Sequence, residues 1–133
     1  MKRVFVYGSL KSGHWNNPIL GNSKLLGEAV TKAKYFLTDC GFPYLIPEHA
    51  LRGAGRHPTA PVAGEVYEVA DEEIMDSLDA LEGVGYGHYD HYNLIVIDQE
   101  GNEQEVVAYV PCEPEMAARY PSCKIVEGKY VWG

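Results

Sequence analysis

Glu82 is the residue of this sequence whose type and position most directly indicate chemistry. The residues before it predict a helix over 72–82, because Asp71 is a suitable N-cap and Gly83 suits the left-handed turn beyond a helix end. Apolar residues recur at helical spacing within it and predict one buried stripe: Ile74, Met75, Leu78 and Leu81. The helix therefore presents an acidic side chain at the end of an apolar face.

The position of Glu82 predicts a carboxyl group with a raised pKa. Asp76 and Asp79 point elsewhere, but Glu82 continues the apolar stripe and should face the interior. Burial disfavours the charged form of a carboxyl group, and the negative end of the helix dipole disfavours it further. A carboxylate of raised pKa suits a general base. The helix by itself leaves one alternative open, in which Glu82 turns back to solvent.

A second group of candidate residues follows the first predicted strand. Residues 3–7 predict a buried β-strand that ends at a glycine-rich loop over 8–13. Gly8 lets the backbone approach a ligand closely, and consecutive N–H groups with the Ser9 hydroxyl can bind a carboxylate or a phosphate. The glycine spacing matches neither a P-loop nor a dinucleotide-binding fingerprint. A plain turn after a strand is the alternative, and these residues alone leave it open.

The order of several segments along the chain is more specific than any one of them. The segments are 4–13 followed by Asn17 and Leu20, then 41–47, 62–69, 78–83, 107–110 and Trp132. Together they resemble the gamma-glutamylcyclotransferase-like family, particularly the short branch that includes gamma-glutamylamine cyclotransferases. The resemblance spans nearly the whole chain. It implies a single domain over residues 1–133, of the α+β class, built as a small mixed β-barrel with a few flanking helices.

The resemblance also implies roles for individual residues. Glu82 corresponds to the catalytic glutamate of the family, and the loop Tyr7, Gly8, Ser9 and Leu10 corresponds to its substrate-binding loop. Tyr89 and Tyr109 are candidates for lining the same pocket, although aromatic residues in strands more often belong to a core.

The activity that the resemblance implies is an intramolecular acyl transfer. The α-amine of a γ-glutamyl group attacks its own γ-carbonyl, which closes 5-oxoproline and expels an amine or an amino acid. Glu82 would act as general acid and base in this amide-cleaving, lyase-like reaction, and no cofactor is implied. The alternative comes from another class of protein: a non-catalytic domain that binds or sequesters a small molecule in the same cavity.

The segment 88–92 departs from the family pattern. Many relatives carry a tyrosine followed shortly by an arginine there, whereas this sequence reads His-Tyr-Asp-His-Tyr. A histidine does not reproduce the bidentate contact of arginine with a carboxylate, so the preferred γ-glutamyl compound stays open. His88 and His91 have a spacing that could ligate a metal, but such residues more often line a site or lie on the surface, and no metal is predicted.

Composition and charge disfavour several classes of partner. The 133 residues carry a formal net charge of -8, which disfavours nucleic acid and anionic membrane surfaces. The sequence shows neither a signal peptide nor an apolar run of about 18 residues, so we expect a cytoplasmic protein whose partner is a small γ-glutamyl compound. Cys40, Cys112 and Cys123 are odd in number and widely spaced, which indicates neither a disulfide framework nor a zinc site. The oligomeric state stays open.

The remaining patterns predict mainly strands. They are expected near residues 3–7, 26–38 (as one long strand or a pair), 62–69, 92–98 and 104–110. Residues 98–102 predict a turn that joins the last two strands as an antiparallel hairpin, because Gly101 and Asn102 tolerate positive φ. Residues 113–119 predict a short helix that Pro121 ends. Many strands with few helices indicate the α+β class.

Overall fold

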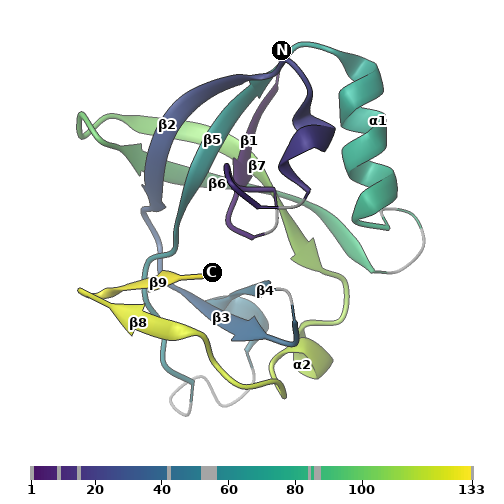
Figure 1. Cartoon of the computed structure of the whole chain (residues 1–133). Coiled ribbons are helices and arrows are strands. Elements are labelled where there is room, and N and C mark those ends of the chain that lie inside the picture. The colour runs from purple at the N-terminus through teal and green to yellow at the C-terminus, as the bar shows by residue number, and fades with distance from the viewer. Residues whose placement is uncertain are drawn as a thin grey trace.

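A closed β-barrel forms the centre of the computed structural model, which describes residues 2–8, 10–14, 16–41, 43–51, 57–83, 85 and 88–132 (Figure 1). Its strands are β1 (Lys2–Val6), β2 (Lys24–Thr31), β5 (Ala63–Val69), β6 (Tyr89–Asp98) and β7 (Glu103–Pro111). They follow one another around the barrel in the order β1-β5-β2-β6-β7, and all pairs are antiparallel except β1 with β7. The predicted mixed barrel is therefore confirmed.

The helix α1 (Glu72–Leu81) lies against the outside of this barrel (Figure 1). The Asp71 carboxylate accepts a hydrogen bond from the Glu73 N–H at 2.8 Å, as expected of an N-cap. Glu82 is the C-cap, and Gly83 follows with a φ of 66°. The predicted helix and both of its end signals are confirmed.

Two hydrophobic clusters pack on the two faces of the barrel sheet. In β1, Phe5 lies opposite Val66 and belongs to one cluster, whereas Val4 lies opposite Tyr67 and belongs to the other. The second cluster also contains Leu78 of α1. Because β1 is buried on both faces, its sequence is a continuous apolar run and not an alternating one. The second cluster is what holds α1 against the barrel.

The expectation that Leu81 belongs to the buried stripe of α1 is wrong. Leu81 is 42% exposed, whereas Leu78 is fully buried and Met75 is 9% exposed. At about 100° per residue, Leu81 and Glu82 lie on opposite sides of Leu78 around the helix axis. The barrel covers the side that carries Met75 and Glu82, so Leu81 is left facing solvent.

Two small sheets lie beyond one end of the barrel (Figure 1). The strand β3 (Tyr35–Asp39) pairs with β4 (Pro43–Pro47), and β8 (Lys124–Val126) pairs with β9 (Lys129–Val131). The segment predicted over 26–38 is thus a pair of strands, β2 and β3, which belong to different sheets. The strands β4, β8 and β9 were not predicted from the sequence. Such short strands depend on contacts with distant residues, such as the 2.8 Å hydrogen bond from the Cys123 N–H to the Leu37 carbonyl.

Three short helical turns complete the described elements: η1 (Asn17–Leu20), η2 (Glu48–Ala50) and α2 (Pro114–Ala117). The last one confirms the short helix predicted over 113–119, although it is shorter. None of the helices within the described ranges is long and apolar enough to cross a lipid bilayer.

The predicted hairpin between β6 and β7 is confirmed. The Asp98 N–H donates to the Asn102 carbonyl at 3.0 Å, and the Asp98 carboxylate accepts the N–H groups of Glu100 and Asn102 at 3.0 and 2.9 Å. Gly101 has a φ of 83°, but Asn102 is not among the described residues with positive φ. The turn therefore needs one residue in the left-handed region and not two.

Leu78 and Leu81 provide a matched pair of substitutions within one helix. We expect Leu78→Ala to lower the free energy of unfolding by about 2–5 kcal/mol, because it leaves a cavity between α1 and the barrel. Leu81→Ala should lower it by about 0.5 kcal/mol or less, because this side chain is already partly in water. Urea denaturation followed by circular dichroism measures both values. Equal losses in the two variants would contradict the burial of α1 described above.

Candidate active site

A cavity of about 730 Å³ opens where the end of β1, the start of β4, the end of α1 and the helix α2 meet. The sequence-predicted site residues that line it are Tyr7, Gly8, Leu10, Glu82, Tyr89 and Tyr109. Ser9, the remaining one, lies outside the described residues. Residues from positions 7 to 109 of the chain are thus brought together around one space.

Several residues that line the cavity were not predicted as site residues. They are Pro43, Tyr44, His88, Glu113, Met116 and Tyr120, among others. The segment 41–47 stood out in the sequence only as part of the resemblance, and 113–119 only as a short helix. Neither segment contains a motif that predicts which part of the fold it packs against. The sequence therefore carried no signal that these residues line the cavity.

Glu82 carries the most perturbed carboxyl group at this site. It is partly buried at the end of α1, where its N–H donates to the Leu78 carbonyl at 3.0 Å. Removal from water raises the pKa of its carboxyl group to about 7. The raised pKa of Glu82 agrees with the expectation from the sequence, and its cause is desolvation.

Three tyrosines lie within electrostatic reach of the Glu82 carboxylate. The pKa values of Tyr7, Tyr89 and Tyr109 are all raised, and burial is the largest cause in each case. The negative charge of Glu82 raises each of them further. All three side chains therefore keep their phenolic protons at physiological pH.

The phenolic hydroxyl groups donate their protons to acceptors of the protein. Tyr7 donates to the Tyr109 backbone carbonyl at 2.5 Å, and Tyr109 donates to the Asp79 carboxylate at 2.6 Å. Tyr89 donates to the Pro43 carbonyl at a longer 3.3 Å. The backbone of Leu45 also hydrogen-bonds to the Tyr7 phenolic group. The phenolic oxygens of Tyr89 and Tyr109 retain acceptor capacity, which suits a ligand that brings hydrogen-bond donors.

Gly8 is required by close packing across the cavity. A Cβ at this position would lie 2.8 and 2.9 Å from the Cγ and Cδ atoms of Pro43, at the start of β4. The Lys11 N–H donates to the Gly8 carbonyl at 3.0 Å and closes a turn. The Asn17 side-chain amide donates at 2.9 Å to the Leu10 carbonyl. The absence of a side chain at Gly8 therefore allows β4 to approach the end of β1.

The C-terminal segment supports the same loop. Trp132 is buried, and its ring lies 5.4 Å from that of His14 between centroids. The Lys11 ammonium group donates a hydrogen bond to the Trp132 carbonyl. The tryptophan included in the resemblance thus packs against the loop that follows β1.

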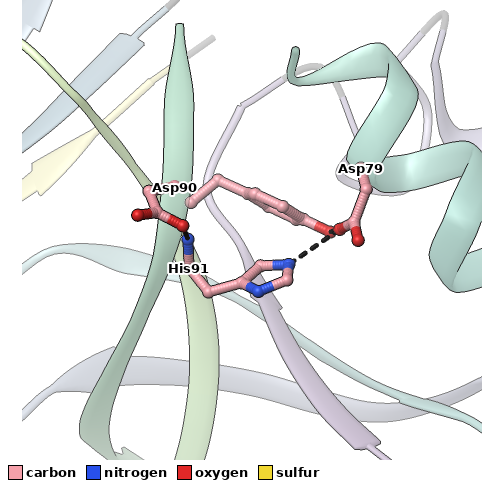
Figure 2. A network of polar contacts seen from close by, with 4 residues as sticks. Asp79, Asp90 and His91 are labelled. Atoms are coloured by element: carbon pink, nitrogen blue, oxygen red, sulfur yellow. Dashed lines mark hydrogen bonds and ion pairs between the residues drawn. The ribbon is translucent and has the colours of Figure 1, made fainter. Parts of the chain in front are cut away.

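The two histidines of segment 88–92 occupy different environments. His88 lines the cavity beside Gly83, where an added Cβ would lie 2.7 Å from the His88 Cδ2 atom. His91 instead places its Nε2 atom 2.7 Å from the Asp79 Oδ1 atom, as Figure 2 shows. In the part of the chain that the structure describes, no group of three or more His, Cys, Asp or Glu residues is arranged to hold a metal ion.

Asp79 corrects one expectation from the helical periodicity. It was placed away from the buried stripe, but its side chain is turned toward β6 and β7, where it contacts His91 and Tyr109. Burial by itself would raise the pKa of Asp79, but the hydrogen bonds from Tyr109 and His91 outweigh it and hold the pKa below its usual range. Asp79 is therefore a partly buried carboxylate, one helical turn before Glu82.

Comparisons with known proteins identify the family of this chain. The family model described as gamma-glutamyl cyclotransferase, AIG2-like, matches residues 4–131. A Methanocaldococcus jannaschii protein named "Putative gamma-glutamylcyclotransferase MJ1514" is 38% identical over 113 residues, which cover 82% of this chain and 83% of that protein. A Vibrio cholerae protein named "Putative gamma-glutamylcyclotransferase" is 43% identical over 82 residues, which cover 61% of this chain and 62% of that protein.

Solved structures show the same fold. An aig2-like protein from Mus musculus, also called ggact, has a TM-score of 0.70 at 29% identity, with 85% of this chain and 78% of that chain covered. YkqA from Bacillus subtilis has a TM-score of 0.68 at 22% identity and supports the fold alone. The match covers 97% of this chain but only 39% of YkqA. With a family match over most of its length, the chain belongs to the gamma-glutamyl cyclotransferase, AIG2-like family and is a gamma-glutamylcyclotransferase-like enzyme.

Proposed function

We propose that the protein releases 5-oxoproline from a γ-glutamyl amine, with Glu82 as general base and then general acid. The α-ammonium group of the substrate gives a proton to Glu82, and the free amine attacks the γ-carbonyl. A new bond forms between the α-nitrogen and the γ-carbon, and the amide bond to the leaving nitrogen breaks. Glu82 gives this proton to the leaving nitrogen, then takes the second proton that the α-nitrogen loses and passes it to the released amine, which departs as an ammonium ion. The α-nitrogen thus goes from an ammonium group to the lactam N–H, and the reaction balances without water or a cofactor.

The observation that carries this proposal is the partly buried Glu82 carboxylate beside the cavity, with its pKa raised to about 7. An ordinary glutamate is too weak a base to take a proton from an ammonium group efficiently. With its pKa near neutrality, the group is substantially ionised at pH 7 and still accepts and returns a proton readily. One side chain can therefore serve both steps.

The surrounding residues support substrate binding in a curled conformation. The phenolic oxygen of Tyr89 has acceptor capacity for an ammonium group, because its proton already goes to a carbonyl group of the protein. Backbone N–H groups of the turn that begins at Gly8 would bind the glutamyl carboxylate and polarise the γ-carbonyl. Nucleophile and electrophile belong to one molecule, so holding them close supplies much of the acceleration.

The lining of the cavity favours an amine over an amino acid as the leaving group. The described residues that line it include the acidic residues Glu82 and Glu113 but no lysine or arginine. A leaving group with its own carboxylate would face Glu113 without a cationic partner. The ring of Tyr44 lies 5.5 Å from that of Tyr89 and 5.8 Å from that of Tyr120, and these rings suit an alkyl chain or an ammonium group.

Substitution of Glu82 tests the catalytic role directly. We expect Glu82→Gln to reduce formation of 5-oxoproline by roughly 100-fold or more, because the amide keeps the shape but does not accept the proton. Glu72→Gln, at an exposed position of the same helix, should keep wild-type activity. Mass spectrometry of reactions with γ-glutamyl amines, γ-glutamyl amino acids and glutathione measures the product. Binding of these compounds without any product would support the alternative of a sequestering protein.

The pH dependence of catalysis follows from the raised pKa of Glu82. We expect kcat/KM to rise about tenfold per pH unit below the pKa of about 7 and to level off above it, because only the ionised carboxylate accepts a proton. The folded chain holds this proton more tightly than the unfolded chain. The stability of the wild type relative to Glu82→Gln should therefore fall as pH rises from about 4.5 through about 7. A difference that is constant with pH would show that Glu82 is not desolvated.

Substrate preference tests the assignment of the leaving group. We expect kcat/KM for γ-glutamyl alkylamines and diamines to exceed that for γ-glutamyl amino acids by at least about tenfold. Repulsion of about 1.4 kcal/mol between Glu113 and the carboxylate of an amino-acid leaving group is sufficient for a tenfold difference. Glu113→Gln should reduce this preference, whereas Glu115→Gln, at an exposed position outside the cavity lining, should not. A preference for γ-glutamyl amino acids would show that the leaving group is an amino acid and not an amine. The proposed role of Glu82 would be unaffected.

A further inference from the structure

The Asp79 carboxylate joins three elements of the fold beside the candidate active site. Its Oδ1 atom accepts a hydrogen bond from the Tyr109 hydroxyl at 2.6 Å. The same atom lies 2.7 Å from the Nε2 atom of His91, a contact drawn in Figure 2. Tyr109 and His91 are directly opposite each other in β7 and β6. A single carboxylate of α1 is therefore bonded to a cross-strand pair of the barrel.

This contact lies where α1 has little other attachment. Leu78 is the last fully buried residue of the helix, and Ala80 and Leu81 are exposed. Glu82 follows immediately as the C-cap. The residues between Leu78 and Glu82 therefore contribute little apolar packing, and Asp79 supplies hydrogen bonds from this turn to the barrel.

The chemistry of the contact makes it a strong one. Hydrogen bonds to a carboxylate are shorter and stronger than those between neutral groups. Because the pKa of Asp79 lies below its usual range, the carboxylate stays ionised at the pH of the proposed reaction. The Asp90 carboxylate accepts the His91 N–H at 2.8 Å, which restrains the histidine backbone (Figure 2).

We propose that Asp79 is a positioning residue for Glu82, and that His91 and Tyr109 fix it by hydrogen bonds to its carboxylate. The inference rests on the proposed role of Glu82 as general base. The same network reaches the substrate loop, because the backbone carbonyl of Tyr109 accepts the hydroxyl of Tyr7 at 2.5 Å. The proposed network also gives His91 a structural role, although His91 does not line the cavity. Loss of the network would let the last turn of α1 move and Glu82 leave its desolvated position.

The first test follows the Glu82 carboxyl group and needs no turnover. Its pKa is measured by ¹³C NMR titration of the carboxyl carbons, with the signal assigned by its absence in Glu82→Gln. In Asp79→Ala we expect the pKa to fall from about 7 toward that of an ordinary glutamate. Asp76→Ala, an exposed aspartate of the same helix, serves as the control and should leave it unchanged.

Two further variants separate the contact from the charge of Asp79. Asp79→Asn removes the charge but keeps an acceptor for Tyr109, so the pKa of Glu82 should fall less than in Asp79→Ala. His91→Ala keeps the charge and removes one partner, and should also lower the pKa of Glu82. Equal shifts in Asp79→Asn and Asp79→Ala, with none in His91→Ala, would reduce the effect to charge alone and overturn the proposal. The folded state of each variant is checked by circular dichroism.

Kinetics provide the second test. Asp79→Ala should lower kcat by roughly 10-fold to 100-fold, with a smaller change in KM, because a displaced base impairs proton transfer more than binding. His91→Gln, which can still donate to Asp79, should recover activity relative to His91→Ala. An increase in KM with kcat unchanged would contradict a positioning role. If the wild type forms no 5-oxoproline, the proposed function fails, and the titration still decides whether Asp79 positions Glu82.

Discussion

The packing of α1 on the outer face of the barrel sets the environment of Glu82, and the candidate active site depends on it. Met75 and Leu78 pack in one cluster with Val4 and Tyr67 of the barrel. Burial of these apolar side chains fixes the rotation of the helix about its axis, and this rotation places Glu82 at the cavity. The same burial removes the carboxyl group from water and raises its pKa. A core contact thus sets the pKa of a carboxyl group at the candidate active site.

The opposite wall of the cavity depends on a second close contact. Pro43 packs so tightly on Gly8 that no Cβ fits between them, and Trp132 and Lys11 meet on the other side of the loop. These contacts come from β4 and from the end of the chain. Gly8 and Lys11, which follow β1, are thus contacted by residues far from them in sequence.

Strong local patterns were sufficient for the elements that the sequence predicted well. The helix was identified by an N-cap, an apolar periodicity and a terminal glycine, and the β6–β7 hairpin by its turn residues. Short strands such as β8 and β9 carry no such signal, because three residues do not establish a period. The exposure of Leu81 had a different cause. Periodicity predicts that a helix has a buried face, but the partner decides where that face begins and ends.

The sequence by itself determined the helix that ends at Glu82, the glycine turn after β1 and, through their order and spacing, the family resemblance. These are local properties, since caps, turns and periodicity act over a few residues. Only the tertiary structure decided that His88 faces the cavity while His91 bonds to Asp79, and that Tyr44 and Glu113 join the lining. Those contacts link segments separated by many residues, and their geometry is set by barrel closure and side-chain packing, which have no signature in the local sequence.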